Sequence, residues 1–302
     1  MRIGLIGYGE VGKILAGALV EQRAEWVGTY DLLLEDPLSA GAMEAHARQA
    51  GVQVAPSMAE LLAESELVIS AVTASQTLAV ATEAARAIRP ATWFLDLNSA
   101  SPGTKTECSR LIDAAGGRYV ESAVMTSVPP YGIKVPMLLG GPSAGAIRPL
   151  LTSLGFSAEV ADERIGVASA IKMCRSVVIK GMEAIFIESL VTARQYGVEA
   201  EVLASLQETF PTLDWEEQAS YFFSRVAQHG RRRAEEMREA ATTVKEAGLE
   251  PHLAAAIAER HDWVARLKRS AHLGEVGKNA NWREYADRLR AQTPLAAQGE
   301  SQ

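Results

Sequence analysis

Hydrophobic residues in the first half of the chain form short runs, separated by amphipathic stretches. The runs have the length and β-branched content of buried parallel strands. They predict strands at 2–6, 26–30, 52–54, 67–72, 93–97, 118–123, 136–141 and 157–160. Helical spacing of apolar residues between them predicts helices at 11–20, 42–50, 58–64, 75–88, 103–115 and 144–154. This alternation predicts an α/β fold with a doubly wound, mainly parallel sheet.

The pattern changes after residue 162. Strand-like runs stop, and apolar residues recur at helical spacing. They predict helices at 168–196, 199–209, 215–228, 231–247, 252–267 and 282–292. Gly248 and Pro251 are the expected stop signals between two of them. We therefore predict an α/β domain over residues 1–162 and an all-α C-terminal domain over residues 163–302.

Three glycines follow the first predicted strand. Gly7, Gly9 and Gly12 form G-x-G-x-x-G where that strand turns into a helix. Such a turn aims backbone N–H groups and the positive end of the helix dipole at one point, which suits a pyrophosphate. The sequence thus predicts a Rossmann-type, NAD(P)-binding domain. Its predicted cofactor-binding residues are Gly7, Tyr8, Gly9, Glu10, Val11 and Gly12, with Val72 and Thr73 after a neighbouring strand.

Asp31 ends the second predicted strand, nineteen residues past Gly12. A carboxylate near this spacing accepts hydrogen bonds from the adenosine ribose. It would also repel a 2′-phosphate, and Leu32, Leu33 and Leu34 supply no arginine to bind one. Asp31 therefore favours NAD, with NADP as the alternative cofactor. The competing interpretation is an ordinary turn followed by a solvated aspartate.

Composition narrows the classes of protein. The 302 residues are 48% hydrophobic and 22% charged, which is typical of a globular chain. Lys and Arg number 30 against 37 Asp and Glu, so no positive excess attracts nucleic acid or anionic lipid. Two cysteines and five histidines lack disulfide or metal-ligand spacing. With a strand predicted from residue 2 and no membrane-span run, we expect a cytoplasmic protein.

Two stretches are candidates for the reaction chemistry. The first follows strand 93–97 and offers Asn98, Ser99 and Ser101 as neutral hydrogen-bonding groups. Ligands of parallel sheets bind at the carboxyl ends of strands, so this loop suits a substrate carboxylate or hydroxyl. The alternative is a turn whose serine caps the next helix.

The second stretch opens the long helix predicted at 168–196. Lys172, Ser176 and Lys180 are spaced four apart and fall along one helix face among apolar neighbours. Apolar surroundings disfavour the charged form of a lysine, which then exchanges protons near neutral pH. Alcohol dehydrogenation needs such a base, and Ser176 would orient the substrate or the ammonium. The alternative is a solvated lysine on an amphipathic helix.

Both stretches resemble motifs of the β-hydroxyacid dehydrogenase family, which includes 3-hydroxyisobutyrate, tartronate-semialdehyde and 6-phosphogluconate dehydrogenases. Residues 96–102 (DLNSASP) resemble its substrate loop D-x-S-T-x-x-P. Residues 166–176 resemble its segment G-x-G-x-x-x-K-x-x-x-N, which makes Lys172 the implied general acid/base. The resemblance covers nearly the whole chain and implies a Rossmann domain followed by a helical domain.

Three departures from the family pattern concern the substrate. Ser176 stands at the family's substrate-binding Asn, and residues 125–127 (MTS) replace its Gly-Gly. The family's Lys-Asp pair falls near Glu235 and Glu236, after three arginines at 231–233. Those arginines are either a solvated helix start or include one that reaches a substrate carboxylate. The R-R-A-x-E-M motif at 232–237 fits a poorly characterised subgroup. The predicted substrate-binding residues are Asn98, Ser99, Ser127 and Ser176.

These observations predict an NAD(P)-dependent oxidoreductase of a small β-hydroxyacid or related polar alcohol. One alternative is an imine or iminium reductase on the same scaffold. Another is an NAD(P)-binding protein without catalysis. Apolar helix faces that one small domain cannot cover predict a homodimer through the helical domain.

Overall fold

The computed structural model describes residues 1–270, 273, 276 and 280–291. The chain forms two compact units, one made of Met1–Cys174 with Lys245–Gly248 and one made of residues 175–244 with the chain after 248. The last strand ends at Asp162, whereas the first unit continues to Cys174. The domain boundary at residue 162 stays a prediction. Within the described ranges, no helix combines the length and apolar character that a bilayer span requires.

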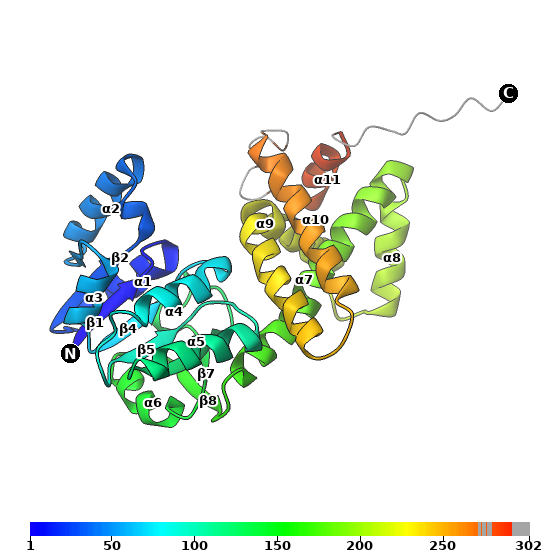
Figure 1. Cartoon of the computed structure of the whole chain (residues 1–302). Helices are drawn as coiled ribbons and strands as arrows, with labels where there is room; N and C mark the ends of the chain where they lie inside the picture. Colours follow the sequence, from blue (N-terminus) through cyan, green and yellow to red (C-terminus); the bar gives the residue numbers. More distant parts are fainter. Residues whose placement is uncertain (271–272, 274–275, 277–279, 292–302) are drawn as a thin grey trace. The chain divides into compact units, whose positions relative to one another are not determined.

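The first unit is built on one eight-stranded sheet with the strand order β3-β2-β1-β4-β5-β6-β7-β8. Neighbouring strands are parallel except β6 and β7, which are antiparallel. The predicted mainly parallel sheet is confirmed (Figure 1). The strands are β1 (Arg2–Ile6), β2 (Trp26–Tyr30), β3 (Gln53–Val54), β4 (Leu67–Ser70), β5 (Trp93–Asp96), β6 (Arg118–Val124), β7 (Met137–Gly140) and β8 (Ala158–Asp162).

Helices connect these strands and cover both faces of the sheet. They are α1 (Glu10–Glu21), α2 (Pro37–Gln49), α3 (Met58–Glu64), α4 (Thr77–Ala84), α5 (Pro102–Ala114) and α6 (Ala144–Ser153), with short 3₁₀ turns η1 (Leu32–Leu34), η2 (Ala74–Gln76) and η3 (Gly132–Lys134). The helix predicted at 75–88 is too long. After Ala84, Arg86 and Ala87 donate to carbonyls three residues back, and Pro90 cannot continue a helix.

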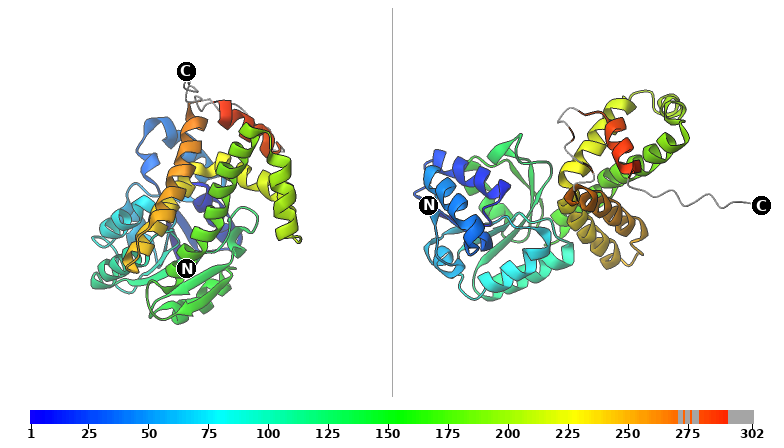
Figure 2. Two further views of the ribbon diagram at one scale, coloured as in Figure 1. Left: turned by 90° about the vertical axis from the view of Figure 1, so that its right-hand side faces the viewer. Right: turned by 90° about the horizontal axis from the view of Figure 1, so that it is seen from above.

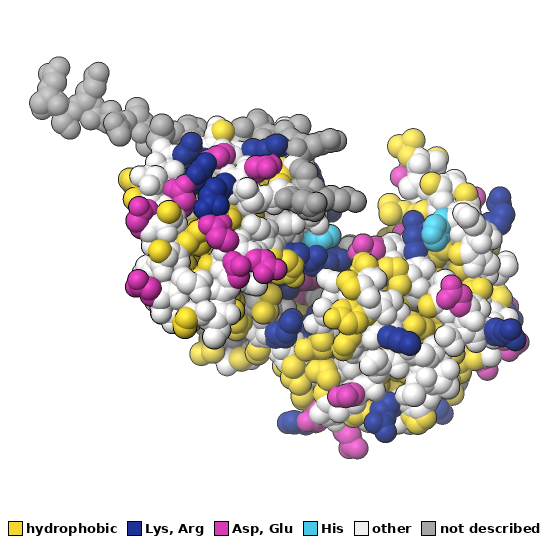
Figure 3. Space-filling model, turned by 180° about the vertical axis from the view of Figure 1, so that it is seen from behind, with side chains coloured by type: hydrophobic (Ala, Val, Ile, Leu, Met, Phe, Trp, Pro, Cys, Tyr) yellow, Lys and Arg dark blue, Asp and Glu magenta, His cyan; other side chains and the backbone are white. Residues whose placement is uncertain are grey.

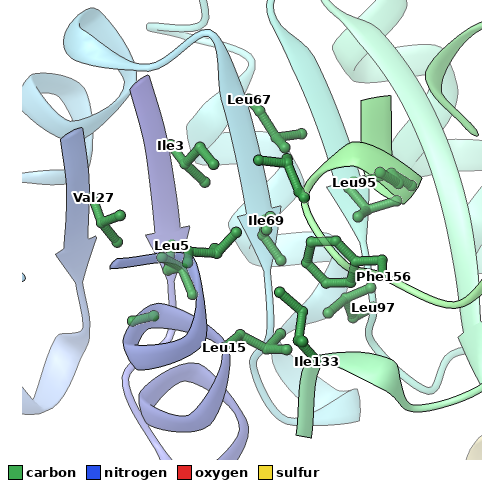
Figure 4. Packing of buried hydrophobic residues seen from close by; sticks show 14 of the residues in the cluster. Ile3, Leu5, Leu15, Val27, Leu67, Ile69, Leu95, Leu97, Ile133 and Phe156 are labelled. Carbon is green, nitrogen blue, oxygen red and sulfur yellow. The ribbon is translucent and has the colours of Figure 1, made fainter. Parts of the chain in front are cut away.

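Alternation along the central strands explains the two covered faces. On β4, Leu67 and Ile69 join a core with α1, α2 and α6, whereas Val68 joins a second core with α3, α4 and α5. Because successive strand side chains point to opposite faces, a strand buried on both sides is apolar throughout. Figure 4 shows the first core, where Leu15 of α1 lies against side chains of the neighbouring strands.

The second unit is helical. Helix α7 (Val167–Tyr196) begins in the first unit and continues into the second. The others are α8 (Glu199–Thr209), α9 (Trp215–Glu246), α10 (His252–Arg269) and α11 (Trp282–Ala291); position 292 of the predicted last helix lies outside the described residues. Their core is aromatic, with the rings of Phe186 and Trp215 stacked at 5.1 Å. The second part of the predicted α/β plus all-α architecture is thereby confirmed.

Helix α9 corrects a prediction. The sequence predicts two helices, 215–228 and 231–247, but one helix of 32 residues runs from Trp215 to Glu246. Gly230 does not stop it, because this glycine serves helix packing instead. A Cβ at Gly230 would lie 2.8 Å from the carbonyl oxygen of His261 on α10. Helices α9 and α10 therefore pack closely side by side (Figures 1 and 2).

The surface of the helical unit mixes both signs of charge. Figure 3 shows Lys and Arg side chains next to Asp and Glu side chains on the face in view. Ion pairs of this unit include Arg266–Asp262, at 2.8 Å, and Arg283–Glu216, at 2.6 Å. Exposed pairs of this kind contribute little to stability, so the stability of the unit depends on its buried contacts.

Candidate functional site

The glycine-rich turn between β1 and α1 has the geometry of a phosphate-binding loop. Gly7 has a φ of +98°, and a Cβ there would lie 2.4 Å from the carbonyl oxygen of Ala71. A Cβ at Gly12 would lie 2.0 Å from the carbonyl oxygen of Gly7. A Cβ at Gly9 meets no atom within 4 Å, so this position is open toward the first turn of α1. Gly7 and Gly12 thus permit close backbone packing, and Gly9 leaves open space at the N-terminus of α1.

This turn fits the pyrophosphate of a dinucleotide. Gly9 is the N-cap of α1 and offers no side-chain acceptor to the helix N–H groups. An open, uncapped helix N-terminus binds anions through those groups and the helix dipole. Glu10 and Val11 form the first turn of α1, where their backbone would contribute.

Asp31 links the ends of two strands. Its Oδ2 accepts the backbone N–H of Tyr8 at 2.6 Å, and its Oδ1 accepts that of Leu33 at 2.9 Å. The Tyr8 side chain is buried, with its hydroxyl 3.1 Å from Nδ1 of His46. Asp31 therefore lies beside the glycine-rich turn and holds that turn in place. Its assignment to the adenosine ribose stays a prediction.

Asn98 ties the carboxyl ends of β4 and β5 together. Its Oδ1 accepts the N–H of Val72 at 2.7 Å, and its Nδ2 donates to Ser70 Oγ at 2.9 Å. Thr73 follows Val72, with its hydroxyl 3.3 Å from that of Ser75. The Asn98 side chain is buried by these contacts. Its assignment to the substrate stays a prediction.

Lys172 and Ser99 meet at this edge of the sheet. The Nζ of Lys172, in the second turn of α7, donates to Ser99 Oγ at 2.6 Å. Ser99 is half-buried, whereas its neighbours Asn98, Ala100 and Ser101 are buried. The sequence proposed both residues for the site from separate motifs, and the fold places their side chains in contact.

The loop that carries Ser99 is held from both of its ends. On the strand side, Asp96 Oδ1 accepts the N–H of Asn98 at 2.9 Å and pairs with the buried Lys105 at 2.9 Å. On the helix side, Ser101 caps α5 by accepting the N–H of Thr104 at 3.2 Å. Ser101 is thus a helix cap, the structural alternative that its position allowed.

Two carboxylates that the sequence analysis did not single out complete this region. Glu246, the last residue of α9, accepts the Ser101 hydroxyl at 2.8 Å and the N–H of Gly103 at 2.9 Å. Glu121 of β6 is buried and accepts three hydrogen bonds from the start of α7. Burial raises the pKa of Glu121, while Lys105 and these donors oppose the increase. A charged residue inside the apolar run RYVESAV was the available signal for Glu121.

Ser127 and Ser176 are the remaining predicted substrate residues. Ser127 is half-buried in the segment after β6. Ser176 is buried in the second unit, where its Oγ accepts from Lys180 Nζ at 3.1 Å, and Lys180 also pairs with Glu236 at 2.9 Å. Both assignments stay predictions.

The arginine run lies inside α9, so the prediction of a helix start there is wrong. Arg231 is exposed, 3.5 Å from Glu235, and Arg232 lies 3.7 Å from Glu236. Arg233 is buried and makes a bidentate pair with Glu183, with its Nε 2.7 Å from Oε2. The bidentate arginine contact therefore goes to a carboxylate of α7.

Comparison with known proteins gives the same picture. Residues 2–145 match the model of the NAD binding domain of 6-phosphogluconate dehydrogenase, and residues 193–264 match a domain of unknown function. The solved structure of a conserved hypothetical protein from Sinorhizobium meliloti is 38% identical, covers 96% of each chain and has a TM-score of 0.75.

Two further structures connect the chain to dehydrogenases. A conserved protein described as structurally similar to 3-hydroxyacid dehydrogenases is 33% identical, with 89% of this chain and 98% of that chain covered and a TM-score of 0.68. The 3-hydroxyisobutyrate dehydrogenase of Mycobacterium tuberculosis, solved with L-serine, shares the fold at 20% identity and a TM-score of 0.69, over 96% of this chain and all (100%) of that one. The chain carries an NAD(P)-binding domain on a hydroxyacid dehydrogenase scaffold, and it belongs to the β-hydroxyacid dehydrogenase family, in the group that resembles 3-hydroxyisobutyrate dehydrogenase.

Proposed function

We propose that this protein is an NAD-dependent oxidoreductase that interconverts the alcohol and carbonyl forms of a small β-hydroxyacid or related polar alcohol. The contact between Lys172 Nζ and Ser99 Oγ, at 2.6 Å, carries the proposal. It joins an amine and a hydroxyl at the carboxyl edge of a parallel sheet, where ligands of such sheets bind.

The cofactor half of the proposal concerns the turn at residues 7–12. Its backbone would hold the pyrophosphate, Asp31 the adenosine ribose, and the segment at Val72 and Thr73 would lie alongside the dinucleotide. When bound, a nicotinamide cofactor accepts or supplies the hydride. The Asp31 carboxylate supports NAD over NADP, because a negative charge there would repel a 2′-phosphate.

Lys172 would move the proton. As an alcohol is oxidised, its Nζ takes the hydroxyl proton, and in the reverse direction it returns that proton to the carbonyl oxygen. Ser99 accepts from Lys172, so its own O–H can donate to a substrate oxygen. Asn98, Ser127 and Ser176 are the other proposed substrate contacts, and Asn98 also holds the loop.

A substrate panel with a matched pair of variants tests the proposal. Purified protein is assayed with β-hydroxyacids, other polar alcohols and imines, each with NAD and NADP in the appropriate redox state. We expect NAD-linked oxidation of a β-hydroxyacid. Lys172→Ala should lower kcat by about 10²–10⁴-fold and leave the Kd for NADH unchanged. Lys134→Ala, which removes an exposed lysine in the same unit, is the control.

Each other outcome selects a different function. Near-normal turnover by Lys172→Ala would remove Lys172 from the mechanism. Turnover of imines alone would identify an imine reductase. NADH binding without turnover of any compound would identify an NAD(P)-binding protein without catalysis.

We also propose that the protein is a homodimer through the helical domain. Ile171, Val178 and Ile185 are exposed at seven-residue intervals on α7, and Val178 and Ile185 are 62% and 65% exposed. Apolar residues at this spacing form one stripe along a helix, which suits a second copy of the same helix. Light scattering should give a dimer mass for the protein and a monomer mass for Val178→Lys. Leu253→Lys changes an exposed residue of α10 and should stay dimeric. A monomeric parent protein would contradict the proposal.

A further inference from the structure

Glu121 is a charged residue in the middle of a buried strand. Its side chain has no exposed surface. Burying a carboxylate is costly unless it is hydrogen-bonded or paired. A glycine faces it on β7, where a Cβ at Gly140 would lie 2.1 Å from Oε1. The surrounding chain is therefore shaped to admit this carboxylate.

All three donors to Glu121 come from the start of α7. Its Oε1 accepts the N–H groups of Gly166 at 2.9 Å and Ala168 at 3.1 Å. Its Oε2 accepts the Ser169 hydroxyl at 3.0 Å. A carboxylate at this position satisfies N–H groups that a helix N-terminus leaves unpaired and complements the helix dipole. The contacts fix both the position of the first turn and its rotation about the helix axis.

That turn controls where Lys172 lies. Lys172 follows Ala168 by four residues, so the two positions share one face of α7. The lysine amine reaches Ser99 from this position. A shift or rotation of the first turn would therefore move Nζ away from Ser99.

Ser99, the hydrogen-bond partner of Lys172, follows β5, and β5 lies next to β6 in the sheet. Asp96 of β5 and Glu121 of β6 are paired in the sheet register. Asp96 holds the N–H of Asn98, next to Ser99, and Glu121 holds the start of the helix that carries Lys172. Adjacent carboxylates thus orient the two halves of one contact.

We propose that Glu121 is a positioning residue of the reaction: it fixes the first turn of α7 so that Lys172 lies within hydrogen-bond reach of Ser99 and of the substrate. The role in turnover rests on the proposed function, whereas the effect on Lys172 does not depend on it.

Glu121→Gln keeps the shape of the side chain and removes its charge and one acceptor. We expect kcat to fall by about 10- to 100-fold, since small misplacements of catalytic groups have effects of this size, and the Kd for NADH to change less than about twofold. Hydrogen exchange of amides in residues 166–172 should become faster, and modification of Lys172 by an amine-selective reagent, measured by mass spectrometry, should change several-fold. These two measurements need no substrate.

Asp113→Asn is the matched control. Asp113 also holds β6, accepting the Tyr119 N–H at 2.9 Å and the Ser109 hydroxyl at 2.7 Å, and none of its hydrogen bonds described here involves α7. It should lose stability without changing Lys172 modification or kcat. Equal losses in both variants, or Glu121→Gln with parent-like exchange, modification and kcat, would overturn the proposal.

This design distinguishes a failure of the proposed function from a failure of the role of Glu121. If the parent protein turns over no substrate, the proposed function fails, and the exchange and modification measurements still decide the role of Glu121. If Glu121→Gln does not fold, Glu121→Asp shortens the side chain while keeping its charge. The contacts to α7 are then longer, so hydrogen exchange, Lys172 modification and kcat should change as in Glu121→Gln but by smaller amounts. A Glu121→Asp variant that matches the parent protein in every measurement would contradict the positioning role.

Discussion

The two units use carboxylates differently. In the α/β unit, Asp31, Asp96 and Glu121 accept hydrogen bonds from backbone N–H groups close to strand ends, and Asp96 also pairs with Lys105. In the helical unit, Glu183 and Glu236 pair with the cations Arg233 and Lys180. Backbone contacts of the first kind fix loops and helix starts beside the candidate site. Ion pairs of the second kind join one helix to another.

The difference indicates that carboxylates have separate roles in the two units. Carboxylates in the first unit hold backbone next to the candidate site residues. Those in the second unit link α7 to α9, which lie far apart in the sequence. We therefore expect substitutions of Asp31 and Glu121 to change binding or rate, and substitutions of Glu183 and Glu236 to change mainly the free energy of unfolding.

The largest expected effect is on the buried pair Glu183–Arg233. Glu183→Ala leaves the Arg233 guanidinium buried without its bidentate partner, which should lower the free energy of unfolding by about 3–5 kcal/mol. Urea unfolding measures this, and the Kd for NADH should stay unchanged in the folded protein. Glu188 lies on the same helix as Glu183, and Glu188→Ala breaks its exposed pair with Arg260 of α10, which should cost less than about 1 kcal/mol. Similar stabilities of the two variants would break the contrast between buried and surface pairs.

The glycine-rich turn offers a sharper comparison inside the first unit. Gly12→Ala would place a methyl group against the Gly7 carbonyl, so it should destabilise the protein by about 1–3 kcal/mol. Gly9→Ala meets no protein atom and should leave the melting temperature unchanged, while NADH binding weakens about tenfold or more because the methyl obstructs the phosphates. Thermal unfolding and NADH titration measure the two effects. Tight NADH binding by Gly9→Ala would contradict a phosphate site at this turn.

The smallest expected effect, about 1.4 kcal/mol for one pH unit below 6.5, is a pH dependence of the helical unit. Burial, together with the nearby cations Arg233 and Lys180, lowers the pKa of His261 to about 3. The imidazole is therefore neutral at pH 7, and its 3.7 Å approach to Glu183 is not an ion pair. Between pH 6.5 and about 3 the unfolded chain binds one more proton at this position than the folded chain. The free energy of unfolding should thus fall by about 1.4 kcal/mol for each pH unit below 6.5 from this residue alone.

His261→Asn isolates that contribution. Burial raises the pKa of Glu183, whose contribution has the opposite sign because the folded chain then holds the extra proton. The difference between the parent protein and His261→Asn removes most of this opposing contribution. Urea unfolding at several pH values should give a steeper acid loss for the parent protein, and parallel curves would show that His261 does not set the dependence.

Features encoded by contiguous residues were predictable from the sequence. The turn at Gly7 and Gly12, the strand end at Asp31 and the alternation of strands and helices all depend on local spacing. Lys172 and Ser99 are 73 residues apart, yet each lies in a recognisable motif. The topology of a parallel sheet then brings the two motifs to one edge.

Other features depend on tertiary contacts that leave little local signal. Glu121 lies 45 residues from Gly166, and Glu246 lies 145 residues from Ser101. Neither spacing follows from helix or strand periodicity. The continuity of α9 through Gly230 also depends on tertiary packing, because a glycine that ends a helix and one that lets α10 approach look alike in sequence. Arg233 resembled a solvated charge, since its burial depends on the position of Glu183.

The return of the chain at Lys245–Gly248 to the first unit bears on any attempt to isolate a cofactor-binding fragment. A fragment ending at Cys174 would lack the Glu246 carboxylate that accepts from Ser101 and Gly103, although it would keep the whole sheet. Gene fusions or domain exchanges designed at a single crossover would separate the Ser99 loop from that support. An exchange of helical units that preserves function therefore requires two junctions in the chain, so that Lys245–Gly248 stays with the sheet of its own protein.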